Sequence, residues 1–179
     1  MDIARPFITA AFMVMGSFFI ILIFFTKMDQ NVQSYAADAI EKFVDDSCTS
    51  GYISPQSYLE MARRINNTGN LYNLSVVHDA KVVSPYVDAD GNEKIGEFVV
   101  TNATYNKEEI LDEMFPMNET DYYNYPMGNG DYLKVTLSLK EPTMAGKLFA
   151  RIARSHEPKT IVYSYGAYVG NTEENGMIK

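Results

Sequence analysis

The side chains whose spacing most suggests chemistry are Asp88, Asp90 and Asn92, in a short segment that also contains Gly91. Carboxylate and amide oxygens in this order are typical of the first half of a calcium-binding loop. The twelfth position of such a loop carries a bidentate Glu, and this chain has Val99 there. Asp, Asn and Gly are also the residues that tight turns favour for backbone reasons. The segment therefore predicts a hairpin turn, with a calcium site as the alternative.

Other reactive side chains are few. His78 lies in a predicted strand and His156 lies before Pro158, so the two histidines have no metal-ligand spacing. Cys48 is the only cysteine, which excludes an intramolecular disulfide and a cysteine metal cluster. We interpret it as a small residue packed at a helix end, with an intermolecular disulfide as the alternative. The sequence also contains no phosphate-binding loop, dinucleotide-binding glycine motif or nucleophile elbow. We therefore predict no catalytic residues, metal or cofactor, and no enzymatic activity.

Two further sets of polar residues are candidates for modification or contact. Sequons of the N-x-[ST] type mark surface loops wherever a host glycosylates them, and they occur at Asn66, Asn73, Asn102 and Asn118. Basic residues also cluster late in the chain, at Lys147, Arg151 and Arg154. We interpret this cluster as a solvated helix face, with acidic lipid or a protein partner as the alternatives.

The overall charge and the aromatic content narrow the class of partner. The chain has 179 residues and a formal net charge of −8, which is a poor match for a phosphate backbone, so we do not expect nucleic-acid binding. It contains 13 Tyr and no Trp. Tyr packs through its ring while its hydroxyl stays hydrated, which suits a surface or subunit contact. We expect residues 116–130 to form an ordered surface loop whose Tyr122, Tyr123 and Tyr125 meet a partner.

The first 46 residues predict one long helix with two different halves. Phe7 to Thr26 is apolar and uncharged, and about 20 such residues cross a bilayer. Beyond it, apolar residues recur at the spacing of one helical face, namely Val32, Tyr35, Ala36, Ala39, Ile40, Phe43 and Val44. A continuous helix of roughly 40 residues would be about 60 Å long. We expect it to fade into a loop over residues 45–51.

The apolar run predicts an uncleaved anchor rather than a signal peptide. It is longer than a signal-peptide core, and the nearest small-x-small site, Ser34–Ala36, lies inside the amphipathic half. Only six residues precede the run, so the simple arrangement places the amino terminus inside the cell and the folded mass outside the cytoplasm. We expect a single-pass protein of the cell membrane.

The remaining sequence predicts an α+β head with a mainly antiparallel sheet packed with helices. We expect a helix after the Ser54 cap and Pro55, a hairpin around Asp90-Gly91, and further helices at 106–115 and 142–154, the latter with Leu148, Phe149 and Ile152 inward. Strands are predicted at 71–81, 95–100, 132–140 and 160–169. The chain then divides into an anchor (1–27), an amphipathic stalk and connection (28–50), the head (51–170) and a polar tail (171–179).

This plan, a membrane helix that continues into a small α+β head, resembles type IV pilins and pseudopilins. A narrower resemblance covers Gly51–Tyr58, Asn67–Tyr72 and Tyr163–Ala167, which look like segments of small single-anchor proteins that accompany Tad/Flp-type pilus machinery in Gram-positive bacteria. The chain has no Glu in its apolar run, whereas prepilins carry Glu five positions after the leader Gly. The resemblance implies a minor pilin or assembly subunit of a Tad-type pilus or related secretion system, incorporated in a surface filament.

This hypothesis assigns contact roles rather than an active site. Phe7 to Phe25 would pack in the bilayer or in a filament, and Val32, Tyr35, Ile40 and Phe43 would hold the head. The expected partners are the lipid bilayer, other pilin or pilus-assembly subunits, and further copies of the chain. The competing hypothesis is a membrane-anchored ligand-binding or sensory domain outside the cytoplasm.

Overall fold

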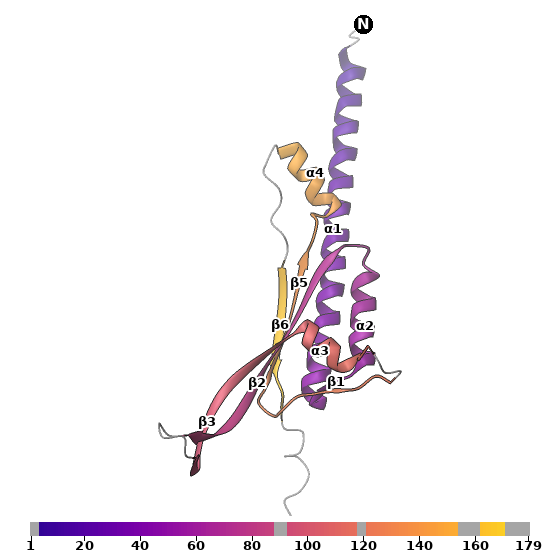
Figure 1. The fold of residues 1–179 in the computed structure, drawn as a ribbon. Coiled ribbons are helices and arrows are strands. Elements are labelled where there is room, and N and C mark those ends of the chain that lie inside the picture. Colours follow the sequence, from indigo (N-terminus) through magenta and orange to yellow (C-terminus); the bar gives the residue numbers. More distant parts are fainter. Residues whose placement is uncertain (1–3, 88–92, 118–120, 154–161, 171–179) are drawn as a thin grey trace, which may run out of the picture.

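The structure is a computed structural model that describes residues 4–87, 93–117, 121–153 and 162–170 (Figure 1). It is an α+β fold in which a long amino-terminal apolar helix is followed by antiparallel sheets packed with helices, as predicted. The helix α1 extends far beyond the head at its amino-terminal end, and a β-hairpin extends from the opposite end of the molecule (Figure 1).

The helix α1 runs without interruption from Ala4 to Ser50. Its 47 residues give a length of about 70 Å, so the prediction of one continuous helix is confirmed. The prediction that it fades at residue 45 is wrong, because Ser47 and Cys48 are buried against the head and extend the packed face by another turn. Gly51 ends the helix in the left-handed conformation, with φ of 75°, and its N–H donates to the Ser47 carbonyl.

Four strands form the main antiparallel sheet, in the order β3-β2-β5-β6. They are β2 (Tyr72–Val87), β3 (Glu93–Asn106), β5 (Tyr132–Leu139) and β6 (Val162–Tyr168). The strand predicted at 132–140 is confirmed as β5, in which every second residue from Leu133 to Leu139 is buried. β2 and β3 are both several residues longer than predicted. A second sheet, not predicted, pairs β1 (Tyr52–Ile53) with β4 (Tyr125–Pro126).

Three short helices complete the head, namely α2 (Pro55–Asn66), α3 (Lys107–Met114) and α4 (Met144–Ala153). The Ser54 hydroxyl accepts a hydrogen bond from the Ser57 N–H at 3.0 Å, which confirms the predicted cap of α2. At the start of α3, the Glu109 carboxylate accepts from the Asn106 N–H at 2.7 Å. In α4, Ile152 is 53% exposed, so its predicted inward position is wrong; Arg154 lies outside the described residues.

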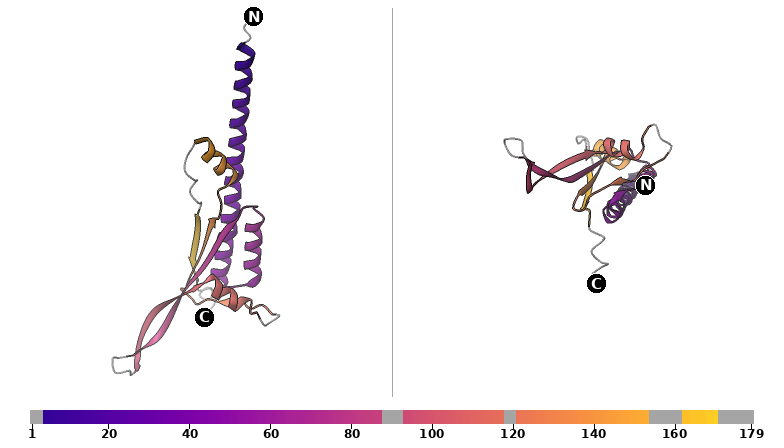
Figure 2. Two further views of the ribbon diagram at one scale, coloured as in Figure 1. Left: turned by 45° about the horizontal axis from the view of Figure 1, so that its top comes forward. Right: turned by 60° about the horizontal axis from the view of Figure 1, so that its bottom comes forward.

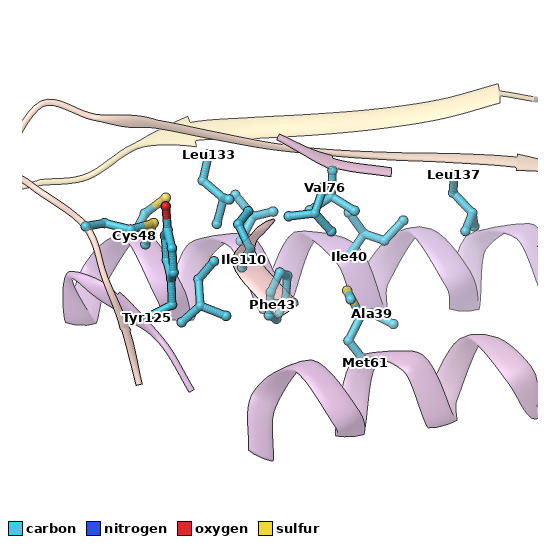
Figure 3. Close-up of a cluster of buried hydrophobic side chains, with 14 of the residues drawn as sticks. Ala39, Ile40, Phe43, Cys48, Met61, Val76, Ile110, Tyr125, Leu133 and Leu137 are labelled. Atoms are coloured by element: carbon cyan, nitrogen blue, oxygen red, sulfur yellow. The ribbon is translucent and has the colours of Figure 1, made fainter. Parts of the chain in front are cut away.

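The core of the head lies between the sheet and the carboxyl-terminal half of α1, with α2 on the other side of that helix (Figure 3). Leu133 and Val76 point from the sheet toward α1, and Ala39 faces Met61 of α2 (Figure 3). Ile40 and Phe43 are buried, as expected of residues that hold the head. Tyr35 is 48% exposed and takes no part in the core, so its predicted role there is wrong.

Candidate functional site

The amino-terminal half of α1 presents an apolar surface that the described part of the chain leaves largely uncovered. From Pro6 to Ile21 every side chain is exposed, and the segment is long and apolar enough to cross a membrane. A soluble surface rarely leaves so large an apolar area in contact with water. The first interaction surface of the molecule is therefore the exposed half of α1.

The other half of α1 is fixed to the head by polar contacts as well as by the core. The Tyr163 hydroxyl on β6 donates to the Glu41 carboxylate, and the Tyr165 hydroxyl donates to Asp45 at 3.0 Å. Burial, together with the Glu41 charge, raises the pKa of Tyr163 to about 12. The phenol therefore stays protonated and keeps donating to Glu41 at neutral pH. These contacts make the stalk a rigid part of the head rather than a flexible tether.

A buried polar network that the sequence did not predict joins three separate segments. His78 on β2 places its Nδ1 2.9 Å from the Tyr125 hydroxyl and its Nε2 3.0 Å from the Asp131 carboxylate. The Asp131 carboxylate also accepts from the N–H of Lys81 at 2.9 Å and from the N–H of Gly128 at 2.6 Å. A neutral imidazole that accepts from Tyr125 and donates to Asp131 satisfies every one of these groups.

This order of side chains has the form of a nucleophile–base–carboxylate relay, with Tyr125 in the first position. The surroundings do not suit that chemistry. Tyr125, His78 and Asp131 are each less than 5% exposed, so a substrate has no approach to them. Burial, and then nearby carboxylates, raise the pKa of Tyr125, which disfavours the phenolate. Burial also opposes ionisation of Asp131, but the N–H groups of Lys81 and Gly128 and the His78 ring outweigh it and lower the Asp131 pKa. The network therefore has a structural role, because its hydrogen bonds connect β2, β4 and the turn before β5.

The hairpin of β2 and β3 forms a second exposed surface. β2 pairs with β5 only from Tyr72 to Asp79, whereas it pairs with β3 as far as Val87. Beyond Asp79 the two strands form a two-stranded ribbon, which we call the arm. It extends away from the head at the end opposite the amino terminus of α1 (Figures 1 and 2).

Apolar side chains cover much of the arm. Large residues on both faces are 38% to 65% exposed, and they include Val82, Val83, Tyr86, Val87, Phe98, Val99 and Val100. The outer edge of β3 is also an edge of the sheet, which leaves backbone N–H and C=O groups available for another strand. A two-stranded ribbon with this much apolar exposure is marginal by itself, and contact with another protein would stabilise it.

The loop of residues 116–130, which we expected to meet a partner, has some of its tyrosines at the surface and one in the core. Tyr122 and Tyr123 are exposed, and the Tyr122 ring packs edge-on against Phe115 with 5.0 Å between centroids. Tyr125 is buried in β4 and bonded to His78, so its predicted role as a surface contact is wrong. The run Tyr122-Tyr123-Asn124-Tyr125 has no periodicity that shows which ring faces inward.

The other candidate positions give no ligand site. Asp88, Asp90 and Asn92 lie outside the described residues, as do His156 and Asn118. Among the described residues, no group of three or more His, Cys, Asp or Glu side chains could hold a metal ion. Asn66, Asn73 and Asn102 are exposed, and they lie at a helix end and in two strands rather than in loops. Cys48 is buried, and its thiol donates to the Ala167 carbonyl at 3.4 Å.

A shallow cleft separates α1 from α2 in the head. The space inside it is about 30 Å³, whereas ligand pockets usually enclose roughly 300–1,000 Å³. Charges of both signs line it, among them Lys42, Asp46, Glu60 and Arg64. The cleft offers little room for a small molecule.

Comparisons with known proteins add no assignment. A scan against protein-family models gives no match, and searches of curated proteins and of solved structures give none either.

Proposed function

We propose that the protein is a single-pass membrane protein that acts by assembly, as a minor-pilin-like structural or assembly subunit of a Tad-type pilus or related secretion system. One observation carries the proposal. A single helix exposes apolar side chains over its first half and forms the centre of the head's core with its second half. A subunit built this way can move its exposed half from lipid into a bundle of like helices without refolding its head.

We further propose that the head lies outside the cytoplasm, on the side where the subunits of a surface appendage would meet. The arm then lies at the end of the molecule that is farthest from the membrane (Figure 2). Its exposed apolar faces and free strand edge suit a contact with a neighbouring subunit.

The competing proposal, a membrane-anchored ligand-binding or sensory domain, has less support from the head. A binding domain needs a pocket of sufficient volume with convergent polar groups. The cleft between α1 and α2 is small, and the convergent polar groups of His78, Tyr125 and Asp131 are buried away from it.

Cross-linking in the native membrane tests the proposal. A photoreactive side chain at Phe98, on the arm, should give adducts with a second protein subunit, whereas the same group at Leu59 on α2 should give none. Both residues are more than half exposed, so accessibility is matched. Surface appendages should also contain the chain. A chain absent from appendages and assembly complexes, whose head binds a small molecule, would instead establish the competing proposal.

A further inference from the structure

The helix α4 contacts α1 close to the point where the apolar segment ends (Figures 1 and 2). Leu22 is 6% exposed, although its neighbours Ile21 and Ile23 are 50% and 62% exposed. A groove at this level is lined by Phe19, Leu22, Ile23, Thr26, Lys27 and Gln30, so it runs across the end of the apolar segment. One side of the apolar segment is therefore covered at Leu22, before the segment ends. The element that contacts α1 near this level is α4.

The position of this contact along the axis of α1 corresponds to the interface between a membrane and water. Leu22 precedes Thr26, the last residue of the apolar run, by four positions, which is about 6 Å along the helix axis. Amphipathic helices that lie in a membrane surface bury their apolar side roughly 5–10 Å into the boundary between headgroups and acyl chains. If the apolar run spans the bilayer, the contact of α4 with α1 lies at the boundary between the headgroups and the acyl chains.

The side chains of α4 suit that position. Ile152 is exposed, and Leu148, one turn earlier on the same face, is half-buried. Lys147 and Arg151 form an exposed basic row next to this apolar row. Lys147 makes an ion pair with Glu141 at 2.9 Å, but both side chains are about half exposed or more, so the pair exchanges readily with other partners.

The charge of this segment opposes that of the whole chain. Residues 140–154 contain four basic residues and one acidic residue, a net charge of +3, while the remaining residues sum to −11. A negatively charged surface attracts a basic amphipathic segment. The same surface repels the acidic remainder of the protein, so the basic segment is the part that binds. If the apolar run spans the bilayer, a phospholipid surface of net negative charge is the surface that suits α4 at this level.

We propose that α4 is an interfacial helix that docks the base of the head onto anionic phospholipid, with Ile152 in the boundary and Lys147 and Arg151 on the headgroups. This inference rests on the membrane anchor of the proposed function. It adds a second contact with the lipid, which fixes the angle of the head relative to the membrane. Each basic residue removed should weaken the docking equilibrium about fivefold.

Spin labels on the full chain test the docking. In a Cys48→Ala background, single cysteines are introduced by Ile152→Cys, Val14→Cys and Leu59→Cys, and each nitroxide is exposed to oxygen and to a water-soluble nickel chelate. The vesicles contain phosphatidylcholine alone or phosphatidylcholine with phosphatidylglycerol. We expect the label at 152 to be reached by oxygen and shielded from nickel in phosphatidylglycerol vesicles, and to be more accessible to nickel without the anionic lipid.

Charge variants supply the matched control. Lys147→Gln with Arg151→Gln should return the label at 152 to water, whereas Arg63→Gln with Arg64→Gln on α2 removes the same charge and should change nothing. Access of nickel to position 152 equal to that at position 59 would overturn the inference, and so would shielding from both reagents, which indicates a protein contact. The label at position 14 separates the two proposals. If it lies in lipid while position 152 lies in water, only the docking of α4 fails, and if position 14 also lies in water, the anchor fails as well.

Discussion

Replacement of Phe43 by Ala tests whether the stalk belongs to the core of the head. Phe43 is 3% exposed on α1, and its ring packs edge-on against Tyr58 of α2 with 6.2 Å between centroids. A Phe→Ala change in a packed core costs about 3–5 kcal/mol, because the transfer energy of the ring is lost and a cavity remains. We expect a loss of this size in the free energy of unfolding.

The matched control is Tyr35→Ala, two turns earlier on the same helix. Tyr35 is 48% exposed and lies outside the core, so its removal should change stability by no more than about 0.5 kcal/mol. The stalk and head together have about 140 residues, for which the entropy of unfolding is about 0.3 kcal/mol/K. The Phe43→Ala loss then corresponds to a melting temperature lower by about 10–17 °C.

Thermal unfolding of the full chain in detergent micelles measures this difference. The chain has 13 Tyr and no Trp, so near-ultraviolet circular dichroism reports the packing of tyrosines in the head. If Phe43→Ala does not fold, Phe43→Leu keeps most of the volume and should still lose the aromatic pair, about 0.5–1.5 kcal/mol. Equal and small shifts for the Phe43 and Tyr35 variants would refute the reasoning, because the stalk would then lie outside the cooperative unit.

Three further predictions follow from single contacts. Asp131→Asn should cost about 1.5–3 kcal/mol at neutral pH. Because folding lowers the pKa of Asp131, the wild-type advantage should be complete above about pH 4 and disappear as the pH falls further, as urea titrations at several pH values will show. Gly166→Ala should cost about 1–3 kcal/mol in a thermal melt, because an added Cβ would meet the Tyr132 ring and lie 2.9 Å from the Leu133 carbonyl oxygen. Burial, with a smaller contribution from Asp45, raises the pKa of Cys48 to about 11, so its thiol should resist a disulfide reagent at neutral pH until the chain unfolds.

Several elements could be predicted because their signals are local. The alternation from Leu133 to Leu139 defines the buried face of β5, and Ser54 with Pro55 defines the start of α2. The continuity of α1 followed from an apolar run that passes into an amphipathic face without a helix breaker. In each case, neighbouring residues contain all the information that the prediction needs.

Other features depend on residues that are distant in sequence. β1 and β4 have two residues each, too few for any periodicity, and they exist because Tyr52 and Pro126 meet across the head. The network of His78, Tyr125 and Asp131 likewise needs three segments to converge. Spacing placed Tyr35 on the apolar face of the stalk, but only the packed structure shows that its neighbour Ala36 is buried while Tyr35 itself stays 48% exposed. Sequence gives the face of an element, and tertiary contacts decide how much of that face is covered.

The contact between α1 and β6 also sets an order of events during synthesis. Tyr163 and Tyr165 reach partners that lie 122 and 120 residues earlier in the chain. At roughly 5–20 residues per second, a ribosome needs about 6–24 s to make the segment between them. Throughout that interval, the sheet that covers the face of α1 with Ile40 and Val44 is incomplete. The membrane segment is therefore made well before the head can close, and a chaperone or the translocation machinery has several seconds in which to hold the nascent stalk.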